Sequence, residues 1–198
     1  MARPSRRMRE AESSYWIGYT DLLSNSLLVL LLTIAIAALA RSNNEKPPLL
    51  RLTEKESFRF SSGSYALNQD FKVALDNKLP WIEDQIKKYK IDSVEVIGHT
   101  DGQPSPGNSN LDLLLPKAGH NLLLQGYQTG SNTDLGLLRA LAVSNYLRGK
   151  LEAKGLRGLT IRPYSAGSLI AGNGAYAPAD RKDRADRRRI ELRFTRQE

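Results

Sequence analysis

Hydrophobic positions along the chain form one continuous run and several shorter periodic groups. Residues 22–40 contain no ionisable side chain and consist mainly of Leu, Ile, Val and Ala, and an aromatic group at residues 15–19 precedes them. As a helix, residues 16–40 rise roughly 37 Å, which is enough to cross a hydrocarbon core of about 30 Å with some tilt. The pattern therefore predicts a transmembrane helix over residues 15–40.

One carboxylate, Asp21, lies near the N-terminal end of this span. A charged side chain inside a bilayer is unfavourable by about 2.5–3.5 kcal/mol or more, so it needs a polar neighbour or a function. Small and polar side chains share its helical face, together with one leucine: Gly18, Ser24, Asn25 and Leu28. We expect this face to contact protein rather than lipid. The alternative is that Asp21 extends to the headgroup boundary.

Downstream of the span, the hydrophobic positions alternate between the periods of strands and of helices. Strands are predicted at 57–60, 93–97, 159–164 and 189–194, and helices at 68–88, at 133–154 and, from charge alone, at 180–186. The order β-α-β-α-β-(α)-β describes an α/β sandwich over residues 57–198. A polar linker over residues 41–56 joins it to the span.

Within this domain, two features interrupt the regular pattern. Pro80 is expected to break or kink the first helix, which Asn68 begins as a cap. Residues 103–131 are rich in Pro, Gly, Asn and Ser, but they carry two apolar patches, at 111–115 and 122–124. We interpret them as an ordered excursion of the chain more than a disordered loop.

Composition narrows the class of function. Among 198 residues there is no cysteine, and His99 and His120 are the only histidines, so neither a disulfide framework nor a Cys- or His-rich metal centre is expected. No nucleophile–His–acid pattern is present, so we expect no enzyme and no cofactor. The net charge of +8 would suggest nucleic acid as a partner. Much of the excess lies before the span and in residues 181–196, and we expect no nucleic acid.

The charges that flank the span predict its orientation. Four arginines precede it within a basic tail over residues 1–14, against Arg41 and Lys46 after it. The positive-inside rule then places the N-terminus in the cytoplasm and the C-terminal domain in the periplasm of a bacterial inner membrane. The alternative is a secretory signal peptide cleaved after Ala38-Leu39-Ala40. The length of the span, its aromatic belt and Asp21 favour a retained helix.

Several short motifs in the C-terminal domain match a known family. They are Phe60-Ser61-Ser62-Gly63-Ser64 with Leu67, Ile97-Gly98-His99-Thr100-Asp101, Asn132, Leu135-Gly136-Leu137-Leu138-Arg139-Ala140 and Arg188-Arg189-Ile190-Glu191. With these motifs, the chain from about Leu50 onward resembles OmpA-like peptidoglycan-binding domains. It departs from that family at Gly136, where a Ser is usual, and at Arg187, where an Asn is usual. The stretch between Asp101 and Asn132 is also much longer than usual, and this insertion would cover or reshape the pocket.

The resemblance implies a ligand and its contacts. In such domains the diaminopimelate of the peptide stem is held by an Asp after the His-Thr pair and by an Arg on the following helix. These two residues correspond to Asp101 and Arg139 here. Thr100, Asn132 and the backbone at Leu135 would complete the hydrogen bonds. Diaminopimelate carries ammonium and carboxylate groups, and a carboxylate and a guanidinium are their complementary charges.

A second resemblance lies at the front of the chain. The string Tyr15-Trp16-Ile17-x-Tyr19-x-Asp21-Leu22 after a basic tail is similar to the B subunit of ion-driven rotary motors. These include the flagellar stator protein MotB and the Zorya anti-phage protein ZorB, and the string is closer to the latter. The resemblance implies two B subunits inside a ring of five multi-span A subunits of MotA or ZorA type. Asp21 would carry the ion, a proton in our interpretation, and the external domain would hold peptidoglycan.

The short linker bears on which motor this is. Sixteen extended residues reach only about 50–58 Å, which is short for the plug-bearing linker expected of a flagellar stator. This favours a non-flagellar motor, and among those we expect anti-phage defence. Three alternatives remain at this point: a flagellar-type stator subunit, a passive OmpA-like wall-binding protein (anchored, or secreted after cleavage), and a Tol- or Ton-type energy-transducing partner.

Overall fold

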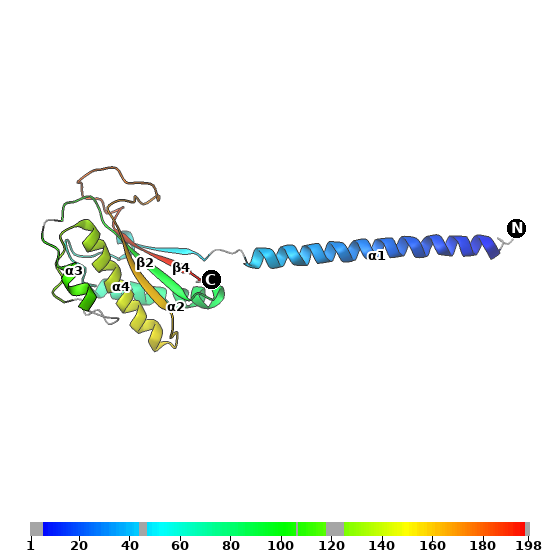
Figure 1. Ribbon diagram of the computed structural model, residues 1–198, viewed down its shortest axis with the longest axis horizontal. Coiled ribbons are helices and arrows are strands. Elements are labelled where there is room, and N and C mark those ends of the chain that lie inside the picture. The colour runs from blue at the N-terminus through cyan, green and yellow to red at the C-terminus, as the bar shows by residue number, and fades with distance from the viewer. Residues whose placement is uncertain (1–5, 44–46, 106, 118–124, 197–198) are drawn as a thin grey trace. The chain divides into compact units, whose positions relative to one another are not determined.

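A computed structural model describes residues 6–43, 47–105, 107–117 and 125–196. The chain divides into two compact units, Met1–Lys46 and Pro47–Glu198. The first unit is the single helix α1 (Arg6–Asn43; Figure 1). It contains the segment Tyr15–Ala40, which is long and apolar enough to cross a membrane by length and composition. The predicted span is confirmed in that sense.

The second unit is a four-stranded sheet with two long helices, which confirms the predicted α/β class. Its main elements, in chain order, are β1 (Leu49–Thr53), α2 (Gln69–Tyr89), β2 (Ser93–His99), α4 (Asn132–Ala153), β3 (Thr160–Gly167) and β4 (Arg189–Thr195). The strand order is β1-β4-β2-β3. Strand β4 runs antiparallel to both β1 and β2, whereas β2 and β3 are parallel. The two edges of the sheet are therefore β1 and β3.

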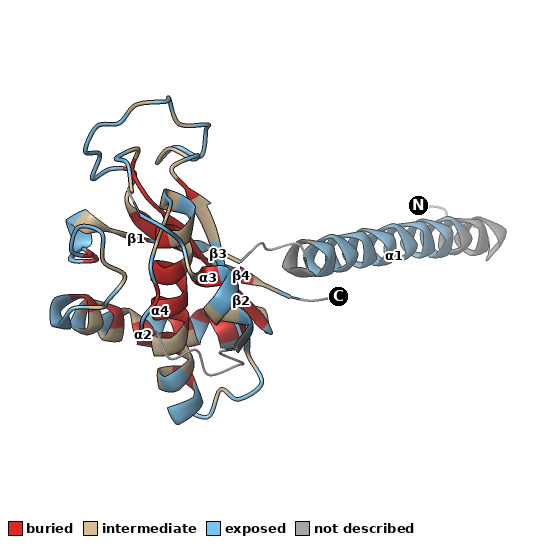
Figure 2. Ribbon diagram, turned by 60° about the vertical axis from the view of Figure 1, so that its left-hand side comes forward, coloured by how far each residue is buried: buried red, intermediate tan, exposed pale blue. Residues whose placement is uncertain are grey.

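One face of the sheet carries the hydrophobic core (Figure 2). Alternate strand residues, such as Leu52, Val96 and Leu192, are fully buried and pack with the apolar stripes of α2 and α4 in a single cluster. Because strand side chains alternate between faces, the neighbouring residues Arg51, Glu95 and Glu191 point to the other face. That opposite face therefore carries charged side chains.

The first strand does not lie where the sequence predicted it. Residues 57–60 are not a strand: Ser57 has a left-handed backbone, with φ of 71°. Phe58 and Phe60 are buried because both rings pack on Phe71 of α2, at centroid distances of 5.1 and 4.8 Å. Their alternation reflects that shared contact. The strand is β1, so the folded unit begins at Pro47 and the linker predicted over residues 41–56 is too long.

Two further expectations are corrected. Helix α2 begins at its predicted cap, where Asn68 accepts a hydrogen bond from the Phe71 amide, but it continues through Pro80. Buried side chains on both sides of Pro80, Leu75 and Ile82 among them, hold the helix together across it. Residues 180–186 form no helix. Instead, Asp180 pairs with Arg187 at 3.0 Å, and this holds the segment as a loop.

The insertion between β2 and α4 is ordered over the residues that the structure describes. It contains the short helix α3 (Leu111–Leu114) followed by one 3-10 turn (Leu115–Lys117). Leu111 and Tyr127 pack with Leu138 and Leu141 of α4 in a second, smaller core. The first apolar patch is therefore a packing surface, whereas the second, at 122–124, lies outside the described residues, as does His120.

Two glycines bring α4 against β2. A Cβ added at Gly98 would lie 1.9 Å from the carbonyl oxygen of Gly136, so the strand and the helix touch through their backbones. This contact lies just before Thr100 and Asp101 on one element and one turn before Arg139 on the other. It therefore fixes the separation of the predicted site residues.

Candidate functional site

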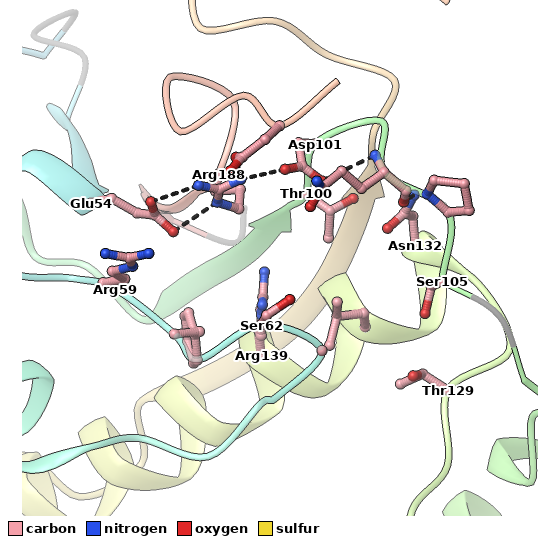
Figure 3. A pocket seen from close by; sticks show the side chains of 16 residues that line it. Glu54, Arg59, Ser62, Thr100, Asp101, Ser105, Thr129, Asn132, Arg139 and Arg188 are labelled. Carbon is pink, nitrogen blue, oxygen red and sulfur yellow. Dashed lines mark hydrogen bonds and ion pairs between the residues drawn. The ribbon is translucent and has the colours of Figure 1, made fainter. Parts of the chain in front are cut away.

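A cavity of about 360 Å³ opens at the end of β2 that Asp101 follows (Figure 3). This volume lies within the range of about 300–1,000 Å³ that is typical of small-ligand sites. All five predicted binding residues line it: Thr100, Asp101, Asn132, Leu135 and Arg139. The fold therefore brings the end of β2, with Thr100 and Asp101, next to the first turns of α4, with Asn132, Leu135 and Arg139, across the whole insertion.

Asp101 is held in place from three sides. It is 5% exposed, and its carboxylate accepts hydrogen bonds from the amides of Gln103 at 3.2 Å and Arg184 at 3.4 Å. The guanidinium of Arg188 forms an ion pair with the same carboxylate. Asp101 is thus a fixed acceptor at the wall of the cavity.

Arg188 joins three carboxylates at this wall. It donates two hydrogen bonds to Glu54, at 2.8 and 3.0 Å, in addition to its ion pairs with Asp101 and Asp183. The bonds to Glu54, and then those to the other two acids, raise the pKa of Arg188. One guanidinium therefore serves three carboxylates. The exposed Arg59 lines the same side next to Glu54 and adds a second positive charge, so one negative charge remains in excess (Figure 3).

Sequence reasoning missed the role of this group. Glu54 fell within the predicted linker, whereas it immediately follows β1. Arg188 was recognised as part of a motif but was given no contact with the ligand site. The sequence signal for its contact with the site was its position directly before β4, whose alternating residues were predicted as a strand.

Arg139 lies on the opposite side of the cavity and is charged but unpaired. Its side chain is 4% exposed and donates to the carbonyl oxygens of Ser64 at 2.9 Å and Ser61 at 3.4 Å. The guanidinium also lies 4.8 Å from the centre of the Phe60 ring. Burial lowers its pKa to about 10. Among the described residues no carboxylate forms an ion pair with it, so an anion is the complementary ligand group.

The remaining predicted residues complete the cavity in different ways. Thr100 is 1% exposed, and its hydroxyl has no hydrogen-bond partner among the described residues. Asn132 donates to the carbonyl oxygen of Gln103 at 2.7 Å, so its amide nitrogen is used to hold the insertion. Leu135 contributes a largely buried apolar contact. Thr100 is therefore the residue of the three that carries a buried hydroxyl without a partner among the described residues.

The insertion forms part of the cavity wall. Gln103, Pro104 and Ser105 line it from the start of the insertion, and Thr129 lines it from the end. The insertion therefore contributes directly to the cavity, and whether it reshapes the site relative to the family stays a prediction.

His99, although adjacent to the site in sequence, lies elsewhere. It is 2% exposed, and its Nε2 lies 3.6 Å from a carboxylate oxygen of Glu191 on β4. Over the described ranges of the chain, no group of three or more His, Cys, Asp or Glu residues is arranged to hold a metal ion.

In the first unit, Asp21 has one polar neighbour on its own helix. Asn25, one turn further along α1, donates a hydrogen bond to its carboxylate at 3.3 Å. Both side chains are exposed in the isolated chain, as are the surrounding apolar residues. This hydrogen bond places Asp21 and Asn25 on one face of α1, and the contact of that face with another protein stays a prediction.

Comparison with known proteins gives structural neighbours only. No family model matches the chain, and no curated protein matches it. It is similar to the periplasmic domain of MotB from Helicobacter pylori, with 20% identity over 76% of this chain and 83% of that chain and a TM-score of 0.49. It is also similar to the cell wall anchor of the T6SS from Pseudomonas aeruginosa, with 22% identity, 75% and 81% coverage and a TM-score of 0.44.

A third neighbour is the OmpA-like domain of FopA1 from Francisella tularensis, with 19% identity, 76% and 75% coverage and a TM-score of 0.37. The two groups that the sequence motifs resemble, MotB-type and OmpA-like proteins, are therefore both found among the structural neighbours. At these identities and TM-scores, the similarities assign no ligand, ion or partner to this chain.

Proposed function

We propose that the folded unit binds the diaminopimelate of peptidoglycan stem peptides in this cavity. The observation that carries the proposal is Arg139, a buried guanidinium without a carboxylate partner among the described residues. A buried charge is unfavourable unless it is paired, so a ligand carboxylate would supply the missing partner. Diaminopimelate in a stem peptide presents such a carboxylate next to a free ammonium group.

The opposite wall suits the ammonium group. Glu54, Asp101 and Asp183 share the guanidinium of Arg188, and the exposed Arg59 also lines this side, so three negative charges lie near two positive ones. An ammonium group next to these acids would reduce the imbalance. The cavity thus combines an unpaired positive charge with an excess of negative charge, which is the complement of a zwitterion.

Binding of meso-diaminopimelate to the full-length protein in detergent tests this proposal by calorimetry. We expect Arg139→Gln and Asp101→Asn each to weaken binding by at least about tenfold, since each removes one partner of a buried charge contact. Arg157→Gln, an exposed arginine outside the cavity, is the control. Unchanged affinity in both cavity variants would exclude the cavity as the site.

We also infer that the chain is the B subunit of a proton-driven motor of the inner membrane, with the N-terminus in the cytoplasm. Support comes from the motor-like string around Asp21 and from the apolar span that contains it. A protonated carboxylate is neutral and is tolerated in an apolar environment, whereas an ionised one needs polar contacts. Each elementary charge that crosses the membrane delivers about 2.3 kcal/mol per 100 mV. Two copies inside five A subunits would couple that energy to rotation.

Anti-phage defence of the Zorya type is the process we propose for this motor. The string from Tyr15 to Leu22 is closer to that group than to flagellar stators. The span ends at Ala40 and the folded unit begins at Pro47, so only residues 41–46 separate them. This is shorter than the linker estimated from the sequence, and it leaves no length for a plug segment of the flagellar type.

A further inference from the structure

The cavity has two chemically different sides. One side carries the charged residues described above, with Glu54 and Arg188 at its edge. The other side is built from the two ends of the insertion and carries no charge: its lining side chains are Gln103, Pro104, Ser105 and Thr129. Figure 3 places Ser105 and Thr129 together on one side of the cavity and Glu54 and Arg59 on the other, with Arg139 between them.

The uncharged side is held by a network of contacts within the insertion. Asn110 donates to the carbonyl oxygen of Gly126 at 2.9 Å and accepts from the amide of Gln128 at 2.8 Å, which ties the two ends of the insertion to each other. Next to this link, a Cβ added at Gly130 would lie 2.8 Å from the amide nitrogen of Ser109. The two ends are therefore in backbone contact.

The insertion is also fastened to the rest of the domain. Asn132, in the first turn of α4, bonds to Gln103, and Tyr65 donates to the carbonyl oxygen of Tyr127 at 3.4 Å. Leu111 and Tyr127 are buried against α4. These contacts place the uncharged wall in a fixed position relative to Arg139, as a binding surface requires.

Hydroxyl groups on this wall are available to a ligand. Neither Ser105 nor Thr129 forms a side-chain hydrogen bond within the described part of the chain, and both are half-buried. The neighbouring Thr100 hydroxyl is fully buried and equally without a partner there. Hydroxyls donate and accept, so together they match groups that offer both an N–H and a carbonyl oxygen.

Diaminopimelate within a stem peptide is divided in the same way as the cavity. One of its two amino-acid centres keeps a free ammonium and a free carboxylate, whereas the other is joined to its neighbours through two amide bonds. The charged side of the cavity suits the first centre, and an uncharged side rich in hydroxyls suits the amides of the second. A sugar would also offer hydroxyls, but in the stem it lies beyond two further residues from diaminopimelate.

We propose that the insertion recognises the amide bonds on either side of diaminopimelate, and that Ser105 and Thr129 make the cavity selective for the stem peptide over the free amino acid. This inference rests on the proposed binding of diaminopimelate. It assigns to the insertion a specificity that the charged residues alone do not provide, because they contact the same zwitterionic end in both ligands.

The test compares two ligands on the full-length protein in detergent, by calorimetry: meso-diaminopimelate and the tetrapeptide stem that contains it. We expect the wild-type protein to bind the tetrapeptide about tenfold or more tightly than the free amino acid, as two or more additional hydrogen bonds allow. The double substitution Ser105→Ala with Thr129→Val should remove most of this preference, by weakening tetrapeptide binding much more than diaminopimelate binding. Asn108→Ala, an exposed insertion residue outside the cavity lining, is the matched control.

The outcomes separate this inference from the proposed function. If the wild-type protein binds both ligands with equal affinity, the insertion does not recognise the amide bonds. The same conclusion follows if the double substitution lowers the affinity for both ligands equally. In either case, binding of diaminopimelate stands. If the wild-type protein binds neither ligand, the proposed function itself fails. If the double variant does not fold, the single variants Ser105→Ala and Thr129→Val are compared in the same way, and an unchanged tetrapeptide preference in both overturns the inference.

Discussion

At the scale of single residues, Glu191 is the most strongly constrained acid on the charged face of the sheet. It is 3% exposed and lies next to His99, and it accepts a hydrogen bond from Arg189 at 2.9 Å. These two neighbours lower its pKa to about 2, against the opposing effect of burial. Arg51 adds a further positive charge at 3.4 Å. The charge of Glu191 is thus a stabilising feature of the folded unit.

The depressed pKa of Glu191 predicts acid sensitivity. Because its pKa is lower in the folded than in the unfolded state, its contribution to stability is complete above about pH 4.5 and is lost as the pH falls towards 2. We expect the free energy of unfolding to fall by about 3 kcal/mol over this interval from this residue alone. Urea unfolding at several pH values measures it. Glu191→Gln should be less stable at pH 7, and its free energy of unfolding should depend less on pH between 4.5 and 2. An unchanged pH dependence in this variant would contradict the assignment.

The contact between Gly98 and Gly136 predicts an asymmetry among glycine substitutions. Gly98→Ala should destabilise the domain by about 3 kcal/mol or more, because its Cβ meets backbone that cannot move as a side chain could. The matched control is Gly149→Ala. Gly149 lies on α4, the helix that carries Gly136, but no atom lies within 4 Å of its added Cβ. This substitution should be neutral or stabilising by up to about 1 kcal/mol. Equal thermal unfolding temperatures for the two variants would refute the close contact.

The site residues were predictable where a residue type and a motif coincided. Asp101 and Arg139 carry opposite charges within matched motifs, and the cavity contains both. Glu54 was not predictable, because its role depends on the pairing of β1 with β4, which brings Thr53 next to Arg189 and so Glu54 near Arg188. Long-range pairing of this kind leaves no local trace in a sequence.

At the scale of elements, periodicity located α2, β2, α4, β3 and β4 to within a few residues, and it failed at β1. The pattern of Leu49-Leu50-Arg51-Leu52 is short and contains only one polar residue, so it gave little alternation to detect. Phe58 and Phe60 alternate more clearly but pack on α2. The failure at residues 180–186 has another cause: the helix there was predicted from charge alone, without an apolar period that would pack it on the sheet.

Strand β1 makes the boundary of the folded unit testable. A chain of residues 57–198 lacks β1, loses the buried Leu52 and leaves the backbone of β4 unpaired along one edge. We expect it to be less stable than residues 47–198 by about 2–4 kcal/mol, from the buried Leu52 at about 1.5–3 kcal/mol and a smaller contribution of the half-buried Leu50. Urea unfolding of the two chains gives the difference. Coincident unfolding midpoints would place the boundary after β1.

At the scale of the whole molecule, Asp21 distinguishes a motor from a passive anchor. We expect Asp21→Asn to insert, to assemble and to bind peptidoglycan as the wild-type protein does, but to abolish activity in a phage-protection assay, since an amide cannot bind and release a proton at physiological pH. Asn25→Ala, one turn away and uncharged, is the control for helix packing. Full protection by Asp21→Asn would remove the motor interpretation and leave a wall-binding anchor.

Native mass spectrometry of the protein, extracted with the products of its neighbouring genes, addresses assembly. A full-length chain, in two copies with five of a multi-span partner, is the expected result. A chain that begins at Arg41 would instead identify α1 as a cleaved signal peptide.

The direction of β1 has a mechanical consequence. The chain enters the folded unit at Pro47, β1 runs from Leu49 to Thr53, and Glu54 then reaches the cavity wall. A pull applied between Pro47 and a ligand in the cavity therefore acts along the strand axis. All the β1–β4 hydrogen bonds would then share the force in shear, instead of opening one after another as in a zipper. If the folded unit is the anchor proposed above, its whole edge strand would carry the load, and shear is the stronger of the two arrangements.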